Sequence, residues 1–118
     1  MSGHAFPKAA RLTQPREFKQ VLDSGQRQSD ACFTLVSSPS ITGQPRLGLV
    51  VARKHLRRAV DRNRVKRMVR ESFRHHRAGL PARDIVVMAR AAAGGKPAPA
   101  LRESLARHWR RMAEACAP

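Results

Sequence analysis

The residues best suited to chemistry in this chain are the arginines and lysines gathered between Arg53 and Arg77. This stretch of 25 residues holds 11 of the 24 basic residues, with only Asp61 and Glu71 as acids. Of the 24 cations 19 are Arg, whose guanidinium group forms bidentate hydrogen bonds with phosphate oxygens. The formal net charge of +16 makes a compact chain repel itself unless a polyanion neutralises it. These features predict binding of a nucleic acid through its phosphates.

Side chains that could hydrolyse a phosphodiester are much less well placed. Such chemistry needs a positioned acid and base, or carboxylates that hold metal ions, whereas the 8 acidic residues are scattered along the chain. His75 and His76 are adjacent and would diverge on a helix, and His55 and His108 have no nearby carboxylate in the sequence. The sequence therefore predicts no catalytic residue and no metal site.

The basic residues are sorted onto one side of a helix that we expect from about Arg57 to His76. At 100° per residue, the apolar stripe comprises Val65, Met68, Val69 and Phe73, and the basic face comprises Asn63, Lys66, Arg67, Arg70, Arg74 and Arg77. Arg62 and Arg64 fall near the two rims of that face, so the triplet Arg62-Asn63-Arg64 could contact phosphates on both sides of a groove. A solvated charged face is one alternative, but it normally mixes both signs. A membrane-surface helix is another, but this one lacks an interfacial Trp.

The expected order of elements is helix, two or three strands, long helix, strand, helix. The first helix runs from Thr13 to near Gly25, strands are expected at 31–37, 47–52 and 84–89, and the last helix begins near Ala100. The first two of these strands are expected to pair as a hairpin across the turn at 39–45. The order predicts a small α+β two-layer sandwich, with the helices packed on a mixed sheet.

One domain accounts for the whole chain of 118 residues. We expect residues 1–10 to be a flexible lead-in and residues 11–115 to be the folded unit. The sequence shows neither a signal-peptide core nor eighteen consecutive apolar residues, and Cys32 and Cys116 are isolated thiols of the kind found in reducing compartments. These observations predict a cytoplasmic protein without a membrane partner.

The residues around the basic helix resemble the signature of bacterial ribonuclease P proteins. The similar segments are Arg46–Lys54 (RLGLVVARK), Ala59–Arg67 (AVDRNRVKR) and Arg70–Arg74 (RESFR), and likeness on both sides extends the match to about 100 positions. The resemblance implies a ribosomal-protein-like α/β sandwich with a left-handed crossover, although parallel crossovers are almost always right-handed. It also implies one protein bound to one catalytic RNA, which removes the 5′ leader of precursor tRNA with Mg²⁺ held chiefly by the RNA.

The resemblance also implies roles for individual residues. Those expected to face the catalytic RNA are Arg62, Asn63, Arg64, Lys66, Arg67, Arg70 and Arg74, joined by Arg57 and Arg58 beside the triplet. Those expected to line a cleft for the single-stranded leader are Phe18, Val36, Arg53 and Lys54, because a basic groove with a stacking aromatic suits an unpaired strand. Core packing is the alternative role of Phe18. Leu22 and Val36 replace aromatic residues of some relatives, so stacking should be weaker here.

Two other classes of protein share this size and charge. A ribosomal protein could have the same fold, but it should bind ribosomal RNA. A module that binds double-stranded DNA would need a helix-turn-helix or similar reader, whereas the basic helix here is expected to pack on a sheet. Identification of the RNA recovered with the protein from cells would separate these classes.

Overall fold

The computed structural model describes residues 10–116. In chain order the elements are α1 (Pro15–Ser24), β1 (Gln26–Ser29), β2 (Phe33–Pro39), β3 (Arg46–Val50), α2 (Ala59–His76), the 3₁₀ helix η2 (Arg77–Gly79), β4 (Arg83–Ala89), the 3₁₀ helix η3 (Ala91–Gly95) and α3 (Ala98–Ala115). The predicted lead-in lies outside the described residues except for Ala10, which is fully buried. The packed unit therefore already includes residue 10.

The four strands form one mixed sheet in the order β1-β2-β4-β3. β2 pairs antiparallel with both β1 and β4, and β3 pairs parallel with β4. The prediction of a hairpin between β2 and β3 is therefore wrong, because β4 lies between these two strands. β4 is buried over most of its length, as expected for a central strand with both faces covered. The sequence does not locate β1, whose residues Gln-Arg-Gln-Ser show no apolar alternation.

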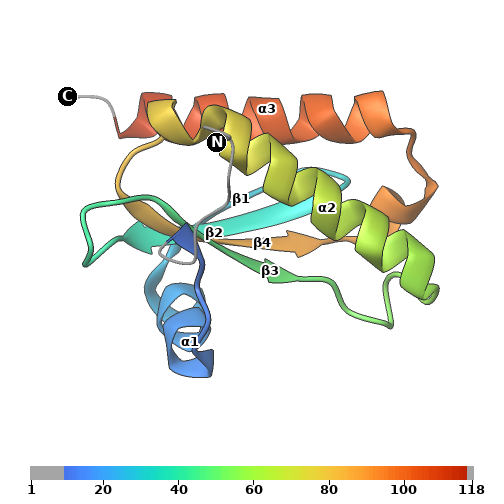
Figure 1. Ribbon diagram of the computed structural model, residues 1–118, viewed down its shortest axis with the longest axis horizontal. Coiled ribbons are helices and arrows are strands. Elements are labelled where there is room, and N and C mark those ends of the chain that lie inside the picture. The colour runs from blue at the N-terminus through green and yellow to red at the C-terminus, as the bar shows by residue number, and fades with distance from the viewer. Residues whose placement is uncertain (1–9, 117–118) are drawn as a thin grey trace, which may run out of the picture.

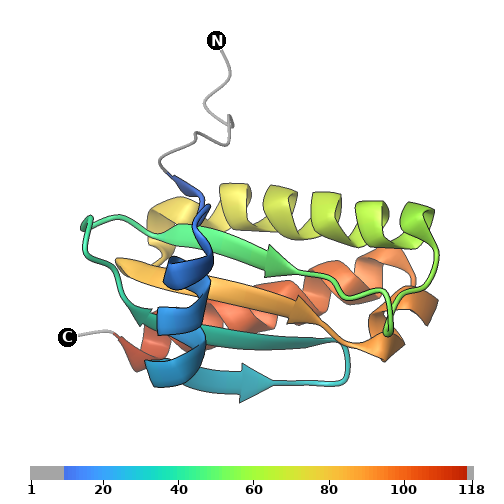
Figure 2. The same ribbon diagram turned by 90° about the horizontal axis from the view of Figure 1, so that it is seen from below.

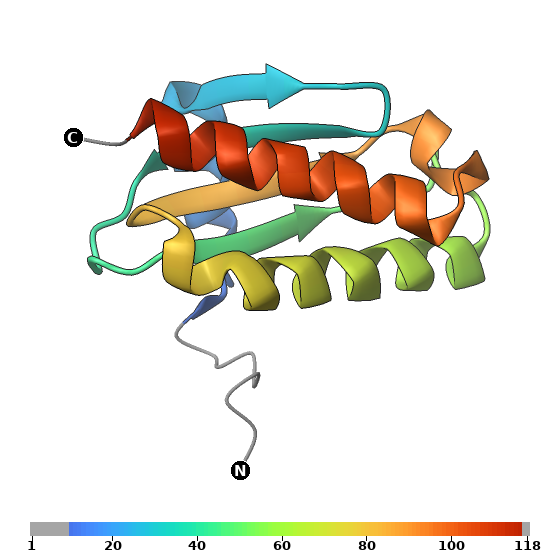
Figure 3. The ribbon, with the colours of Figure 1, turned by 90° about the horizontal axis from the view of Figure 1, so that it is seen from above.

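The long helix α2 joins the parallel neighbours β3 and β4 by a left-handed crossover. Figure 1 shows α2 and α3 side by side over one face of the sheet, and Figure 2 shows α1 lying across the other face. In Figure 3 the helices α2 and α3 face the viewer, and the parallel strands β3 and β4 both run to the right. In this view β4 lies on the same side of β3 as β2 does. A right-handed connection would place β4 on the opposite side of β3. The predicted fold and its unusual handedness are confirmed.

The main core lies between the sheet and the helices α2 and α3. Val65, Val69 and Phe73 of the predicted apolar stripe are buried, while Met68 is only partly buried. Trp109 of α3 meets the Phe73 ring edge-on at a centroid distance of 6.0 Å. Its indole Nε1 donates a hydrogen bond to Ser72 Oγ at 2.8 Å. These contacts fix the rotation of α2, so that its basic face points away from the core.

A second, smaller apolar cluster holds α1 against the opposite face of the sheet. Its buried members are Leu12, Val21, Val36 and Val86. Phe18 packs at the edge of this cluster, directly over Gly48, where a Cβ atom would lie only 2.6 Å from the ring. Gly48 therefore permits the close approach of α1 to β3.

A buried ion pair links α1 to the parallel strands. Arg46 donates from Nε and Nη2 to the two carboxylate oxygens of Asp84 at 2.7 and 2.9 Å, and from Nη1 to Glu17 Oε2 at 2.9 Å. The other oxygen of Glu17 accepts the backbone N–H groups of Thr13 and Gln14. The hydrogen bond from Gln14 is the main influence that lowers the pKa of Glu17, and Arg46 adds to it. Glu17 therefore caps α1 and anchors it to β3.

A polar network at Asp30 joins the β1–β2 turn to α3. One oxygen of Asp30 accepts the backbone N–H groups of Cys32 and Phe33, both at 2.9 Å, and the other accepts the hydroxyl of Ser104. His108 Nε2 lies 3.2 Å from the second oxygen. Burial alone would raise the pKa of Asp30, but these hydrogen bonds outweigh it and lower the pKa to about 2. The ionised carboxylate is therefore part of the folded structure.

Protonation of Asp30 should destabilise the protein in acid. The pKa is depressed in the folded state, so the contribution of Asp30 is complete above about pH 4 and disappears as the pH falls towards 2. We expect a loss of about 2 kcal/mol across this window. Urea unfolding of the RNA-free protein from pH 2 to 6 measures this loss. In the Asp30→Asn variant the free energy of unfolding should change less across the same pH range. Parallel pH profiles for the two proteins would contradict it.

Candidate nucleic-acid interface

The basic face of α2 is open to solvent along its length. Of the nine residues expected to face catalytic RNA, the exposed ones are Arg57, Arg58, Asn63, Arg67 and Arg70, and the half-buried ones are Arg62, Arg64, Lys66 and Arg74. The helix begins at Ala59 rather than near Arg57, so Arg57 and Arg58 belong to the preceding loop. Both still lie beside the first turn of the helix, next to the triplet.

Five of these nine residues line one hollow of about 460 Å³ along α2: Asn63, Lys66, Arg67, Arg70 and Arg74. We call it the α2 hollow. Its lining also includes Glu71 and Arg11. Arg11 is brought there because the N-terminal segment bridges to Leu47 of β3, a long-range contact that sequence reasoning missed. The hollow thus has five cations and one carboxylate, a balance that favours a polyanion.

The two arginines of the triplet are partly engaged inside the protein. Arg62 Nη1 donates to the backbone oxygens of Leu56 and Arg57 at 3.0 and 2.8 Å. Arg64 Nη2 donates to the backbone oxygen of Lys96 at 3.1 Å. A guanidinium carries five N–H donors, so each arginine keeps donors for a phosphate. The triplet therefore fixes the loops beside α2 as well as presenting charge.

A second basic hollow, of about 620 Å³, lies on the opposite face of the sheet, beside α1. We call it the sheet hollow. Val50 and Met88 line it, and both also pack against the α1 cluster. The cations in its lining come from different segments: Arg27 of β1, Lys54 after β3 and Arg90 after β4. An apolar floor with cations around it is suited to an unpaired nucleic acid strand.

The four residues expected to line a leader cleft lie in different environments. Lys54 lines the sheet hollow, and Arg53 is exposed on the same loop. Phe18 is half-buried over Gly48 and packs against the same apolar cluster as Val50 and Met88, but it does not itself line the hollow. Val36 has no exposed surface because it is packed in the cluster beneath α1, so the expected contact of Val36 with a leader is corrected to a packing role.

Arg27 and Arg90 are candidate leader contacts that sequence reasoning missed. Arg27 lies on the edge strand β1, and its side chain forms no hydrogen bond or ion pair within residues 10–116. Arg90 Nη1 donates to the backbone oxygen of Asp30 at 2.7 Å, so its guanidinium is held in place. Both positions depend on the strand order, which a sequence pattern alone does not supply.

The described residues contain neither a cluster of metal ligands nor a membrane-spanning helix. No group of three or more His, Cys, Asp or Glu side chains there could hold a metal ion. No helix in the same range is long and apolar enough to cross a membrane.

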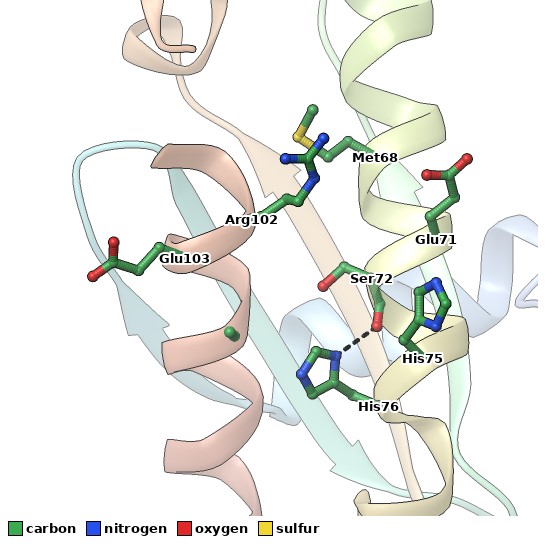
Figure 4. Close-up of a pocket in the computed structure, with 8 residues that line it drawn as sticks. Met68, Glu71, Ser72, His75, His76, Arg102 and Glu103 are labelled. Atoms are coloured by element: carbon green, nitrogen blue, oxygen red, sulfur yellow. Dashed lines mark hydrogen bonds between the residues drawn. The ribbon is translucent and has the colours of Figure 1, made fainter. Parts of the chain in front are cut away.

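The groove between α2 and α3 differs from both hollows. It encloses about 450 Å³, and Figure 4 shows Glu71 and His76 on its α2 side and Arg102 and Glu103 on its α3 side. His76 Nδ1 donates to the backbone oxygen of Ser72 at 2.8 Å. The two carboxylates would repel a phosphate, so this groove is not part of the candidate interface.

Comparison with known proteins decides between the classes that share this architecture. A family model described as Ribonuclease P matches residues 6–113. The chain belongs to the ribonuclease P protein family. It is 46% identical over 112 residues to the ribonuclease P protein component of Thioalkalivibrio sulfidiphilus, covering 95% of this chain and 93% of the relative. With the same component of Methylococcus capsulatus it is 44% identical over 114 residues, covering 97% and 89%.

Solved ribonuclease P proteins have the same fold. The Staphylococcus aureus protein matches with a TM-score of 0.81 at 30% identity, covering 90% of this chain and 96% of that one. The Thermotoga maritima protein, solved in complex with 1-(4-fluorophenyl)-2-thiourea, matches with a TM-score of 0.79 at 31% identity, covering 86% and 98%. The family expected from the sequence is confirmed, and the ribosomal and DNA-binding alternatives are set aside.

Proposed function

We propose that this chain is the protein subunit of ribonuclease P, which assists the removal of the 5′ leader from precursor tRNA. In this proposal the α2 hollow binds the catalytic RNA and the sheet hollow binds the leader. The observation that carries it is the pair of basic hollows on opposite sides of the sheet. Two separate surfaces of this kind suit two RNA strands that are held at the same time.

The protein acts in this proposal through charge and position. Cations from α2 neutralise phosphates of the catalytic RNA, and Arg27, Lys54 and Arg90 neutralise phosphates of the leader. Lower repulsion between the two RNAs strengthens the binding of the precursor and of the Mg²⁺ ions between them. The protein therefore raises affinity for substrate rather than supplying a reacting group.

The bond-breaking chemistry comes, in this proposal, from the partner RNA with its Mg²⁺ ions. Those ions would activate the attacking water and stabilise the leaving oxygen when bound to the RNA. We expect their ligands to come chiefly from the RNA. The protein is an accessory subunit of an endoribonuclease, present as one copy per RNA.

A cytoplasmic location is part of the same proposal. Cys32 and Cys116 are both free thiols, the first buried and the second exposed. An unpaired, exposed thiol suits a reducing compartment. Ribonucleoprotein recovered from the cytoplasmic fraction of cells would support this location, and recovery from the envelope fraction alone would contradict it.

Cleavage of a precursor tRNA at low Mg²⁺ by bacterial ribonuclease P RNA, with and without the protein, tests the function. We expect leader removal to depend on the protein at low Mg²⁺ and to become independent of it as Mg²⁺ is raised. Equal rates in both reactions at every Mg²⁺ concentration would overturn the proposal. So would recovery of ribosomal RNA alone with the protein from cells.

Loss of a cation from the sheet hollow should weaken the binding of precursor tRNA selectively. Replacing Lys54 by Ala removes one ammonium contact with the leader, worth about 1.5 kcal/mol, so we expect roughly tenfold weaker binding of precursor. Mature tRNA has no leader, so its affinity for the holoenzyme should not change. Equilibrium binding of both tRNAs measures the difference. Arg102→Ala is the matched control, and equal losses for both tRNAs would contradict the leader assignment.

A further inference from the structure

A third basic hollow, of about 530 Å³, lies at the C-terminal end of α2. Arg74 and Arg77 line it from the helical side, and Gly43, Gln44 and Pro45 line it from the loop before β3. We call it the terminal hollow. None of its lining residues is acidic, in contrast to the α2 hollow with Glu71. Its positive charge is therefore not balanced within its own lining.

The loop that forms one wall of the terminal hollow is held by its own hydrogen bonds. The backbone N–H of Ser40 donates to Ala82 O at 3.0 Å, and that of Thr42 donates to Ser40 Oγ at 3.2 Å. The N–H of Gln44 donates to Thr42 Oγ1 at 3.3 Å, and Gly43 takes a positive φ of 75° that suits glycine. The wall is thus formed before any ligand binds, which lowers the entropy cost of binding.

The two arginines of the terminal hollow lack acceptors in the structure. Arg74 Nε is buried and has no hydrogen-bond partner. Arg77 is half-buried, and its guanidinium group forms no hydrogen bond or ion pair with residues 10–116. A buried charged donor without an acceptor is unfavourable, and the charge of an anion in the hollow would offset that cost through its attraction to both guanidinium groups. The two arginines therefore favour an anion at this site.

The terminal hollow is continuous with the α2 hollow, because Arg74 lines both. Arg67, Arg70, Arg74 and Arg77 recur every three or four residues, so their side chains follow one line along the helix. A row of cations fits a chain of regularly spaced phosphates better than it fits one small anion.

We infer that the terminal hollow binds phosphates of the same catalytic RNA that occupies the α2 hollow. The inference rests on the RNA-binding role proposed for α2. The RNA footprint then extends beyond the Arg62-Asn63-Arg64 triplet over all 18 residues of the helix, roughly 27 Å, and reaches the 43–45 loop.

The salt dependence of RNA binding tests this inference. We expect Arg77→Ala to reduce the slope of log K against log salt by about 0.7 to 0.9 for each lost phosphate contact. Arg67→Ala in the α2 hollow should reduce it similarly, whereas Arg102→Ala on α3 should leave it unchanged. A normal slope for Arg77→Ala beside a reduced slope for Arg67→Ala would sink the inference and leave the proposed function standing. Normal slopes for both would remove the RNA-binding role of α2 itself.

A second measurement does not depend on the stability of an arginine variant. Gln44 is exposed, so Gln44→Cys in a Cys116→Ser background can carry a tethered iron–EDTA group, with Cys32 buried and unreactive. Hydroxyl radicals from this position should cut the catalytic RNA in the assembled holoenzyme at a discrete site. The same probe at exposed Glu114→Cys on α3 should leave that site uncut. An RNA left uncut by the probe at position 44 would overturn the inference.

Discussion

Replacing Arg67 and Arg70 together by Ala is expected to weaken the binding of ribonuclease P RNA about 100-fold at 0.15 M salt. Both side chains are exposed, both line the α2 hollow, and neither forms a hydrogen bond or ion pair within residues 10–116. Each lost charge-assisted contact with a phosphate costs about 1.5 kcal/mol, and two such losses multiply. The slope of log K against log salt should fall by about 1.4 to 1.8.

Stability measurements separate this effect from unfolding. Removing like charges from one helix face relieves repulsion, so the melting temperature of the free double variant should not fall. Replacing both residues by Lys keeps the charge but loses the guanidinium fork, so the salt slope should be retained while part of the affinity is lost. Unchanged affinity and slope in the Ala variant would show that these residues face solvent in the holoenzyme.

The basic face of α2 is the part of the site that the sequence predicts best. A period of 3.6 residues separates apolar from basic residues within one helix, and Val65, Val69 and Phe73 are buried as that period requires. Local spacing determines which side of a helix a residue occupies, so no knowledge of the rest of the fold is needed. Helical spacing cannot predict that Arg11 lies beside this face, because a bridge to β3 places it there.

Strand partners depend on contacts that are distant in the sequence, and here the prediction was wrong. A short turn at 39–45 between two apolar strands favours a hairpin, yet the seven residues of β4 take the place between β2 and β3. Periodicity cannot distinguish these arrangements, because every strand still buries an apolar face in both. The sequence does not predict the sheet hollow for the same reason, because the strand order is what brings Arg27 and Arg90 together there.

Side-chain contacts within the protein are a further feature that the sequence does not predict. Arg62 and Arg64 read as free cations in the sequence, but both donate hydrogen bonds to backbone oxygens of neighbouring loops. Val36 reads as a residue of an open cleft, but α1 covers it completely. In each case the environment is made by a segment that lies elsewhere in the chain, so residue type and spacing alone cannot assign the role.

Arg46→Ala is expected to lower the free energy of unfolding by about 3 to 5 kcal/mol. Arg46 and Asp84 are both buried, and the guanidinium supplies both hydrogen bonds of a bidentate pair. Removing Arg46 leaves the Asp84 carboxylate buried without a counterion, and it also frees Glu17 and with it α1. Urea unfolding at pH 7 measures the loss. The double variant Arg46→Ala with Asp84→Ala should lose less than the sum of the single variants, because no buried charge remains.

Glu17→Gln separates the anchoring of α1 from the stability of the buried pair. This change removes the ion pair with Arg46 but keeps a side-chain oxygen for the backbone N–H groups of Thr13 and Gln14, so we expect a loss of only about 1 kcal/mol. Phe18 of α1 packs against the same apolar cluster as Val50 and Met88 of the sheet hollow, so a loosened α1 should reduce the affinity for precursor tRNA while that for catalytic RNA stays unchanged. Binding of both RNAs to the Gln variant measures this split. Equal losses for the two RNAs would show that α1 acts only on overall stability, and no loss for either would show that the ion pair does not position α1.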